Sequence, residues 1–279
     1  MAGFERSLSD GLIAKLQNEK IFTDKLLPDI RNGKVFPAVR NEEISFYYKG
    51  GRLFAYDKNG FKTHIKYCII PEFHDNYITE TELNNITIST SFYNEYEEIK
   101  KICELYSGGE ANAVSALYEN ACLSDSRVIF LDTEIALYTN SENDRIDLLL
   151  YDIISRKLCF CEAKLFSNPE IWALKYKKPK VCSQIDKYDK KINTYYDDIV
   201  AQYSNYIGIL NKLFSTDLPV PTSLHKKTGL LITGFDSSQK EKIKNLLIDD
   251  GSLDGISNYR TGELKSKQIS TLFKNITKA

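Results

Sequence analysis

The sequence predicts an α/β protein with a core in the order α-β-β-β-α-β and an α+β extension ahead of it. From residue 110 on, a helical pattern precedes three short apolar strands, a long helical region and one further all-apolar strand. Ahead of this core, one helix and a meander of aromatic-rich strands occupy the first third of the chain. These patterns predict an N-terminal module over residues 1–90, and a core with C-terminal helices over residues 91–279.

The N-terminal module is expected to begin with a helix and continue as a β-meander. Apolar residues recur at helical spacing over residues 9–26, and Pro28 is expected to end that helix. Residues 44–48 and 52–56 flank a Gly-Gly turn, and residues 61–70 follow an Asp-Lys-Asn-Gly turn as a third strand. The aromatic side chains of this meander either pack in a core or form a stacking surface for nucleotides.

The core is expected to hold a mixed sheet flanked by helices. Helical spacing predicts helices over residues 93–106 and 110–122. The elements expected after them are strands over 127–138, 145–152 and 157–165, a helical region over 181–214, a strand over 229–235 and a closing helix over 238–247. The strand over 229–235 is apolar on both faces, which is typical of a strand buried inside a sheet.

Charge and composition exclude several classes of protein. The chain has 37 basic and 38 acidic side chains, a net charge of −1, so any nucleic-acid contact requires a local basic patch. Six cysteines occur without metal-ligand spacing, and neither a signal peptide nor an apolar run long enough to span a bilayer is visible. We therefore expect a cytoplasmic protein with reduced thiols, no membrane contact, no structural zinc and no nucleotide-cofactor motif.

Two carboxylates are expected to face each other across a hairpin. Folding residues 145–152 against 157–165 about a turn at 154–155 places Asp147 directly opposite Glu162, with Cβ atoms roughly 4.5–5.5 Å apart. Side chains alternate along a strand, so Lys164 points to the same face as Glu162. The alternative is a chance occurrence of these three residues in a charged hairpin.

This arrangement predicts a divalent metal site. Two adjacent carboxylates repel each other, and a cation between them turns the repulsion into attraction. Oxygen ligands favour Mg²⁺ or Mn²⁺, and the backbone carbonyl of Ala163 is expected as a further ligand of the metal held by Asp147 and Glu162. Lys164 can orient or deprotonate an attacking water, or stabilise the charge that develops on a phosphoryl group.

Two further acidic residues are candidates for the same cluster. If the hairpin before Asp147 turns near residues 141–142, Glu134 lies about opposite Leu149, one pleat from Asp147. Glu134 is then either a third metal ligand or a solvated carboxylate at a strand end. Helical phase places Glu110 close to the buried face of the helix over 110–122, where a carboxylate is costly unless it is paired or bound to a metal.

Residues 110–235 resemble the PD-(D/E)XK nuclease superfamily. Asp147 matches its strand aspartate and Glu162-Ala163-Lys164 its (D/E)-x-K element, while Ile146 stands where the family usually has proline. Glu110 lies where many members carry a helix glutamate. The resemblance implies a restriction-endonuclease-like core fold and metal-dependent hydrolysis of nucleic acid, with these acidic residues and the lysine in catalysis.

Gln184 and Tyr188 resemble the Q-x-x-x-Y element of the RecB and lambda exonuclease branch of that superfamily. Because they are four residues apart, they lie on one face of a helix. The resemblance implies that Gln184 contacts the lysine of the site or a phosphate, and that Tyr188 supports the site. The alternative is an ordinary polar helix position.

A lysine-rich segment follows the strand that carries Glu162. Residues 175–191 hold seven lysines and two aspartates, a local charge of +5. Lysines neutralise phosphates without reading sequence, so we expect nucleic acid to bind here unless the segment is only a solvated basic loop. Trp172 and Tyr176 can stack on bases. The residues expected to bind nucleic acid are Lys175, Lys177, Lys178, Lys180, Lys187 and Tyr188.

Together these features predict a Mg²⁺- or Mn²⁺-dependent nuclease. We expect it to hydrolyse phosphodiester bonds of DNA rather than RNA, in the prokaryotic restriction or phage-defence role that the resemblance suggests. A homodimer would supply the two sites that cutting both strands of a duplex usually needs. The alternatives are a catalytically silent nucleic-acid-binding or assembly subunit with the same fold, and an interaction protein whose lysines contact an acidic partner.

Overall fold

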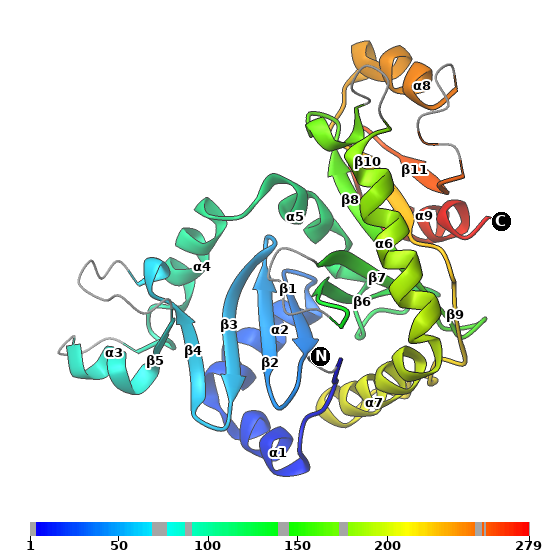
Figure 1. Ribbon diagram of the computed structural model, residues 1–279. Coiled ribbons are helices and arrows are strands. Elements are labelled where there is room, and N and C mark those ends of the chain that lie inside the picture. The colour runs from blue at the N-terminus through cyan, green and yellow to red at the C-terminus, as the bar shows by residue number, and fades with distance from the viewer. Residues whose placement is uncertain are drawn as a thin grey trace. The chain divides into compact units, whose positions relative to one another are not determined.

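A computed structural model of the 279-residue chain describes residues 4–68, 77–86, 91–138, 145–172, 178–248, 253 and 255–278 (Figure 1). The chain forms two compact units of mixed α and β structure, each with its own sheet. The N-terminal unit comprises Glu5–Ser124 and Asn205–Leu218, and the C-terminal unit comprises Met1–Phe4, Asp125–Ser204 and Pro219–Ala279. The prediction of an α/β protein is confirmed.

The predicted boundary between residues 90 and 91 falls inside the N-terminal unit. Helix α4 (Tyr96–Leu105) packs on strand β3 (Gly51–Asp57) of the meander, where the rings of Tyr96 and Phe54 stack with centroids 6.1 Å apart. Residues 91–124 therefore belong with the meander. Periodicity identifies such a helix, but it does not indicate which sheet the helix covers.

The N-terminal unit contains a five-stranded antiparallel sheet in the order β1-β2-β3-β4-β5. Its strands are β1 (Val35–Val39), β2 (Ile44–Tyr48), β3, β4 (Gly60–His64) and β5 (Tyr77–Thr79). Strands β1 and β5 were not predicted, and the third predicted strand ends at His64, where the 3-10 turn η2 (Ile65–Tyr67) begins. Phe46, Phe54 and Phe61 are buried, with neighbouring ring centroids 6.0 Å apart, so these meander aromatics pack in a core.

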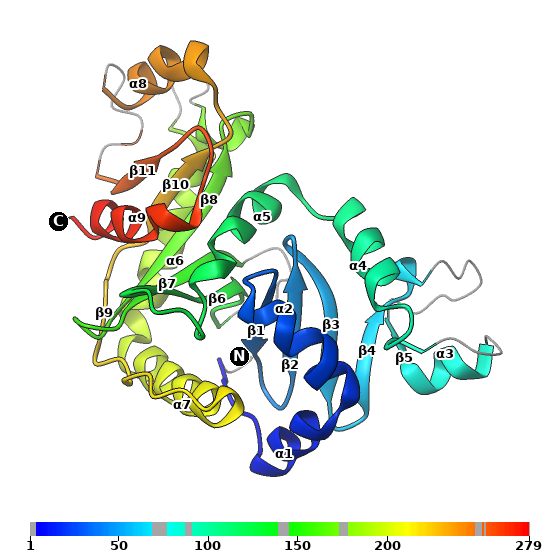
Figure 2. The ribbon, with the colours of Figure 1, turned by 180° about the vertical axis from the view of Figure 1, so that it is seen from behind.

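Helices cover this sheet. The remaining helices of the unit are α1 (Asp10–Asn18), the π-helical turn η1 (Phe22–Leu26), α2 (Leu27–Arg31), α3 (Glu80–Ile86), α5 (Gly109–Val114) and the 3-10 turn η3 (Ser115–Asn120). Helix α2 lies across one face of the sheet, and α1 lies at the end of the sheet where the β1–β2 and β3–β4 turns are (Figures 1 and 2). The prediction that Pro28 ends the first helix is wrong: α1 ends at Asn18, and Pro28 lies in the first turn of α2, which follows η1 directly.

The C-terminal unit contains a mixed six-stranded sheet in the order β11-β10-β8-β7-β6, with β9 beside β8. Its strands are β6 (Val128–Ile135), β7 (Ile146–Asp152), β8 (Lys157–Leu165), β9 (Ser223–Leu224), β10 (Gly229–Thr233) and β11 (Asn258–Arg260). Strands β6, β7 and β8 are antiparallel, whereas β10 runs parallel to both β8 and β11. The three predicted core strands, the later apolar strand and the mixed sheet are confirmed.

Two helices cover opposite faces of this sheet. Helix α6 (Lys180–Thr194) lies over β8 and β10 on one face, and α9 (Ile269–Ile276) lies on the other (Figures 1 and 2). The other helices are α7 (Tyr196–Phe214), α8 (Lys240–Ile248) and the 3-10 turns η4 (Pro169–Ile171), η5 (Ser237–Gln239) and η6 (Ser266–Gln268). The helical region predicted over 181–214 consists of α6 and α7, which Tyr195 separates, and α7 passes from one unit into the other. Among the described residues, no helix combines the length and apolar character needed to cross a bilayer.

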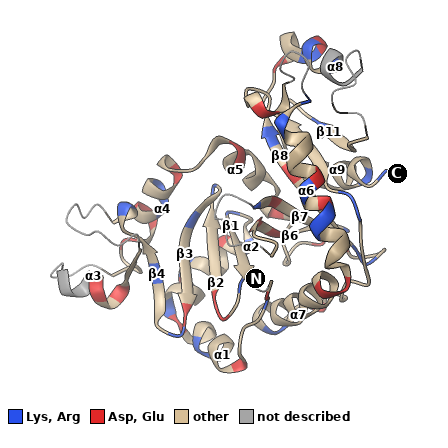
Figure 3. Ribbon diagram, viewed as in Figure 1, with Lys and Arg blue, Asp and Glu red and all other residues tan. Residues whose placement is uncertain are grey.

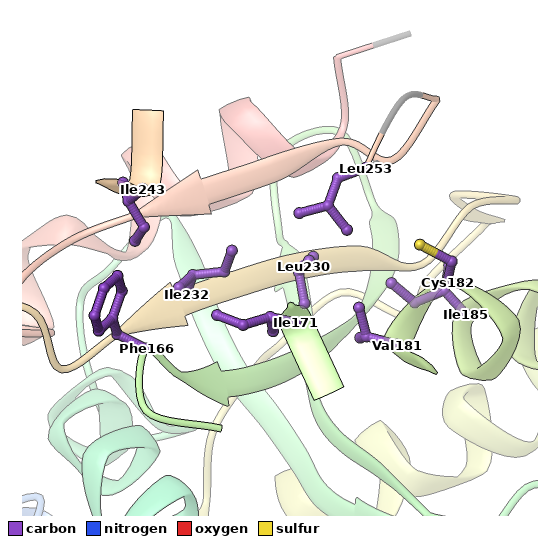
Figure 4. Packing of buried hydrophobic residues seen from close by; sticks show 9 residues of the cluster. All are labelled: Phe166, Ile171, Val181, Cys182, Ile185, Leu230, Ile232, Ile243 and Leu253. Atoms are coloured by element: carbon purple, nitrogen blue, oxygen red, sulfur yellow. The ribbon is translucent and has the colours of Figure 1, made fainter. Parts of the chain in front are cut away.

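An apolar cluster joins α6 to β10 (Figure 4). It consists of Phe166, Ile171, Val181, Cys182, Ile185, Leu230, Ile232, Ile243 and Leu253. On the neighbouring parallel strand, Glu162 pairs with Leu230 and Lys164 pairs with Ile232. Because paired residues project to the same side of a sheet, Glu162 and Lys164 point to the face that α6 covers.

A buried ion pair holds part of the N-terminal unit together. The Nζ of Lys100 on α4 lies 2.6 Å from Oδ2 of Asp29 on α2, and the Tyr96 hydroxyl donates to the same oxygen at 2.9 Å. The Lys100 side chain is 6% exposed. Removal of the ammonium therefore leaves a nearly buried carboxylate without its main counter-charge.

We expect Lys100→Met to lower the free energy of unfolding by about 3 kcal/mol, the cost of leaving a buried charge uncompensated. The matched control is Lys101→Met on the same helix: Lys101 is exposed, its Nζ lies 3.6 Å from Oε2 of Glu98, and its loss should cost less than about 1 kcal/mol. Urea denaturation followed by circular dichroism measures both, and equal effects of the two substitutions would refute the structural role of the pair.

Candidate functional site

Strand β8 changes its neighbour at the place where the predicted site lies. Its antiparallel ladder with β7 runs from Lys157 to Cys161, and its parallel ladder with β10 runs from Cys161 to Leu165. The predicted β7–β8 register is confirmed, with Leu148 opposite Cys161, and the next positions are Asp147 and Glu162. Beyond the ladder, the N–H of Ala163 donates to Oδ2 of Asp147 at 2.7 Å. The Asp147 side chain thus accepts a hydrogen bond that a backbone carbonyl would accept within a ladder.

Asp147 is held in an unfavourable electrostatic environment. Asp147 is partly buried, and this burial raises the pKa of its carboxyl well above the usual range. The nearby charge of Glu162 raises the pKa further. The N–H of Ala163 and the charge of Lys164 oppose this, whereas Glu134 adds to it. The carboxylates of Asp147 and Glu162 are therefore close enough to repel each other. Binding of either a proton or a cation reduces this repulsion.

Lys164 is buried between two carboxylates. It is 6% exposed, and its Nζ lies 2.9 Å from Oε1 of Glu162 and 3.2 Å from Oε2 of Glu170. Glu170, in η4, also binds Nζ of Lys180 at 2.5 Å. Hydrogen bonding to Lys180, and then to Lys164, lowers the pKa of Glu170 against the effect of its burial. Sequence reasoning missed Glu170, because no local pattern shows that the turn after β8 folds back onto Lys164.

Gln184 and Tyr188 on α6 form a chain of hydrogen bonds that ends at Glu162. The Nε2 of Gln184 donates to Oε1 of Glu162 at 2.7 Å and to the Tyr188 hydroxyl at 2.9 Å. That hydroxyl donates to the backbone carbonyl of Arg145, just before β7, at 2.7 Å. Gln184 thus contacts the glutamate, to which Lys164 is also bound, rather than the lysine itself.

Tyr188 does not fit the predicted role of a nucleic-acid contact. Its side chain is 1% exposed, and its hydroxyl already bonds within the chain. Tyr188 lies on the buried side of α6, because it follows Ile185 by three residues and is itself followed by Ile192. It supports Gln184 from inside the unit.

Glu134 lies at a different register position from the predicted one. Strand β6 has an irregularity between Phe130 and Asp132, so that Leu149 pairs with Asp132 rather than with Glu134. Thr133 pairs with Leu148 and Ile135 with Ile146, which places Glu134 at the level of Asp147. Its backbone has a φ of 51°, and its Oε2 lies 3.6 Å from the Arg145 guanidinium. An alternation pattern does not reveal such a bulge.

Two further residues of β6, which sequence reasoning missed, support the aspartate. The Oγ1 of Thr133 donates to the backbone carbonyl of Asp147 at 2.8 Å. Asp132 is fully buried, and its carboxylate accepts the N–H of Thr133 and the Tyr203 hydroxyl, each at 2.8 Å. The available signal was the run of three polar residues, Asp132, Thr133 and Glu134, in a strand whose other residues are apolar.

The remaining predicted residues divide into one in the N-terminal unit, two outside the described residues and three lysines at or near α6. Glu110 is half-buried on α5 of the N-terminal unit, whereas the residues described above all belong to the C-terminal unit. Lys175 and Lys177 lie outside the described residues. Lys178, Lys180 and Lys187 are exposed, and lysine positions recur along the ribbon of α6 (Figure 3).

The donor set of the site suits a small divalent cation held by few protein ligands. Within the part of the chain that the structure describes, no group of three or more His, Cys, Asp or Glu side chains is placed to hold a metal. Asp147 and Glu162 supply two carboxylates, and Mg²⁺ commonly takes only one or two and keeps several waters. The residues present therefore fit Mg²⁺ or Mn²⁺ better than a metal that needs a complete protein cage.

Substitution of Asp147 should stabilise the metal-free protein at neutral pH. A carboxyl whose pKa is raised on folding binds its proton more tightly in the folded state, so stability falls as pH rises from the unfolded pKa, near 3.9, through the raised folded pKa. Asp147→Asn removes that titration and keeps an acceptor for Ala163. We expect a melting temperature above that of wild type in EDTA at neutral pH, with the difference vanishing towards acid.

Asp152 on the same strand is the matched control, with the opposite sign. Burial raises its pKa, but hydrogen bonds from Arg127 and from the N–H groups of Ser155 and Ile154 outweigh burial and lower it. Asp152→Asn should therefore cost about 1–2 kcal/mol above pH 4, roughly 2–8 °C in melting temperature, and the loss should disappear as pH falls through the lowered pKa. Destabilisation of both variants would show that Asp147 is not strained.

Comparison with known proteins identifies no relative of this chain. No protein-family model, no curated protein and no solved structure matches it. The functional interpretation therefore depends on the geometry of Asp147, Glu162, Lys164 and Gln184.

Proposed function

We propose that the chain is a metal-dependent nuclease with a restriction-endonuclease-like core, and that it hydrolyses phosphodiester bonds of DNA. The observation that carries the proposal is the pair Asp147 and Glu162: two carboxylates at the end of a shared ladder, close enough to raise the pKa of one, with Lys164 bound to the other. Repulsion between two carboxylates lowers the stability of the folded protein. Residues with strongly shifted pKa values cluster at functional sites, which supports a functional role for this pair.

Asp147 and Glu162 would hold Mg²⁺ or Mn²⁺. Strand residues direct their N–H and C=O to the same edge, so the carbonyl of Ala163 faces the edge at which its N–H meets Asp147, and it is the proposed third oxygen ligand. The cation would neutralise charge on the phosphodiester and lower the pKa of a bound water. Glu134, at the level of Asp147, remains a candidate additional carboxylate.

The chain's own residues orient this chemistry. Gln184 and Lys164 both bind Oε1 of Glu162, which fixes the direction of that carboxylate. The Lys164 ammonium is buried beside the carboxylate pair, where it can stabilise charge developing on a phosphoryl oxygen or orient the attacking water. Because it is held from two sides, Lys164 loses little freedom when substrate binds.

Helix α6 offers a path for the nucleic-acid backbone. Lys180, Gln184 and Lys187 are four and three residues apart and therefore share one face of the helix. Both lysines are exposed, while Gln184 reaches inward to Glu162. Phosphates bound along this face would pass next to the site. We further propose that the protein acts on DNA in the cytoplasm and has a role in restriction or phage defence. A homodimer would supply the two sites needed to cut both strands of a duplex.

We expect the purified protein to cut DNA with Mg²⁺ or Mn²⁺ and to be inactive in EDTA. Asp147→Asn, Glu162→Gln and Lys164→Met should each lower the cleavage rate by at least about 100-fold, since each removes charge from the reacting centre. Lys157→Met, at the other end of β8, is the matched control and should cut as wild type does. Gel analysis of labelled duplex and single-stranded DNA measures the rates.

Two results would contradict the proposal. Cleavage by Asp147→Asn and Lys164→Met at the wild-type rate would place the chemistry elsewhere. DNA binding that persists in EDTA, with no cleavage under any divalent cation, would instead favour the catalytically silent binding subunit.

A further inference from the structure

Glu170 places a negative charge where the candidate site meets solvent. Its carboxylate contacts Lys164, whose side chain is 7% exposed, and Lys180, whose side chain is 76% exposed. The Glu170 side chain itself is 25% exposed. One carboxylate thus bridges a buried ammonium beside Glu162 and an exposed ammonium at the first residue of α6.

The backbone of Glu170 is fixed, but its side chain can turn. Its N–H donates to Oδ1 of Asn168 at 2.9 Å, and the next residue, Ile171, is fully buried in the apolar cluster (Figure 4). The turn therefore cannot move without disturbing the packing of α6 against β10. Rotation about the side-chain bonds of Glu170 can carry the carboxylate away from both lysines without moving the backbone. An incoming anion must then replace the two contacts that are lost.

We propose that the Glu170 carboxylate occupies, in the free protein, the position of a substrate phosphate, which displaces it and binds Lys164 and Lys180. The inference rests on the proposed function and names the phosphate-binding position of the same site. Carboxylate and phosphodiester are both oxyanions that accept charge-assisted hydrogen bonds from ammonium groups. A phosphodiester has two non-bridging oxygens, one for each lysine.

The position favours an anion for a second reason. Lys180 begins α6, a helix of 15 residues, and the N-terminal end of a helix attracts negative charge. The same position is close to the proposed reacting centre, because Lys164, which lines it, also contacts Glu162. An oxyanion there would lie on the lysine-bearing face of α6, in line with Lys187.

A permanent counter-ion for Lys164 is the competing role, and the two roles differ in their effect on affinity. A displaceable carboxylate competes with DNA, so its removal strengthens binding. A permanent counter-ion positions Lys164 in the complex as well, so its removal leaves binding unchanged or weaker and lowers kcat.

The experiment measures binding of a fluorescein-labelled DNA duplex by anisotropy in EDTA, where the proposed chemistry cannot proceed. We expect Glu170→Gln to bind about threefold to tenfold more tightly than wild type, the effect of removing one partly screened charge. The matched control is Glu263→Gln in the same unit: Glu263 is 76% exposed and pairs with Lys265 at 2.9 Å. It should change affinity less than twofold, because it lies outside the proposed phosphate position.

A second variant keeps the test independent of DNA. Glu170→Ala leaves space for an anion between the two lysines, so inorganic phosphate should raise its melting temperature at lower concentration than it does for wild type. Unchanged or weaker DNA binding by Glu170→Gln, or equal phosphate responses, would overturn the inference. If the wild-type protein cleaves DNA but the Glu170 variants show neither tighter DNA binding nor a stronger response to phosphate, only this inference is refuted. If the variants show both effects but the wild-type protein does not cleave DNA, the proposed nuclease activity is refuted.

Discussion

The candidate site depends on the point where β8 exchanges one neighbouring strand for another. Up to Cys161, β8 shares a ladder with β7, and from there to Leu165 it pairs with β10 on its other edge. Backbone groups that leave a ladder still need partners, and Asp147 gives its carboxylate to the N–H of Ala163. The fork between the strands therefore directs Asp147 inward, and the aspartate in turn bridges the two diverging strands.

Glu162 connects this fork to the rest of the C-terminal unit. One of its oxygens accepts from both Gln184 and Lys164, and Gln184 is itself bonded to a tyrosine anchored on the carbonyl of Arg145. The chain of contacts joins β8, α6 and the start of β7. A buried hydrogen-bond network of this kind fixes the orientation of each side chain in it, and a functional site requires such fixed orientations.

The sequence was most informative where the determining contacts are local. The short turn between β7 and β8 sets their register, so the pairing up to Leu148 and Cys161 could be predicted. Asp147 and Glu162 occupy the next positions, beyond the ladder. The bulge in β6 that brings Glu134 level with Asp147 could not be predicted, because the residues before it are apolar on both faces of the strand and show no alternation for an extra residue to shift. Glu170 was hidden for another reason: its contacts to Lys164 arise from the path of a turn after the strand, which tertiary packing determines.

Neither unit is one continuous stretch of chain. The N-terminal unit is completed by Asn205–Leu218, where Nζ of Lys212 binds Asp10 at 2.8 Å and Gln17 donates to the Lys212 carbonyl at 3.2 Å. During synthesis, strands β6, β7 and β8 of the C-terminal unit are therefore made before Lys212 is available to bind Asp10. No single cut in the polypeptide separates the two units intact. Neither unit can therefore be completed before part of the other has been synthesised.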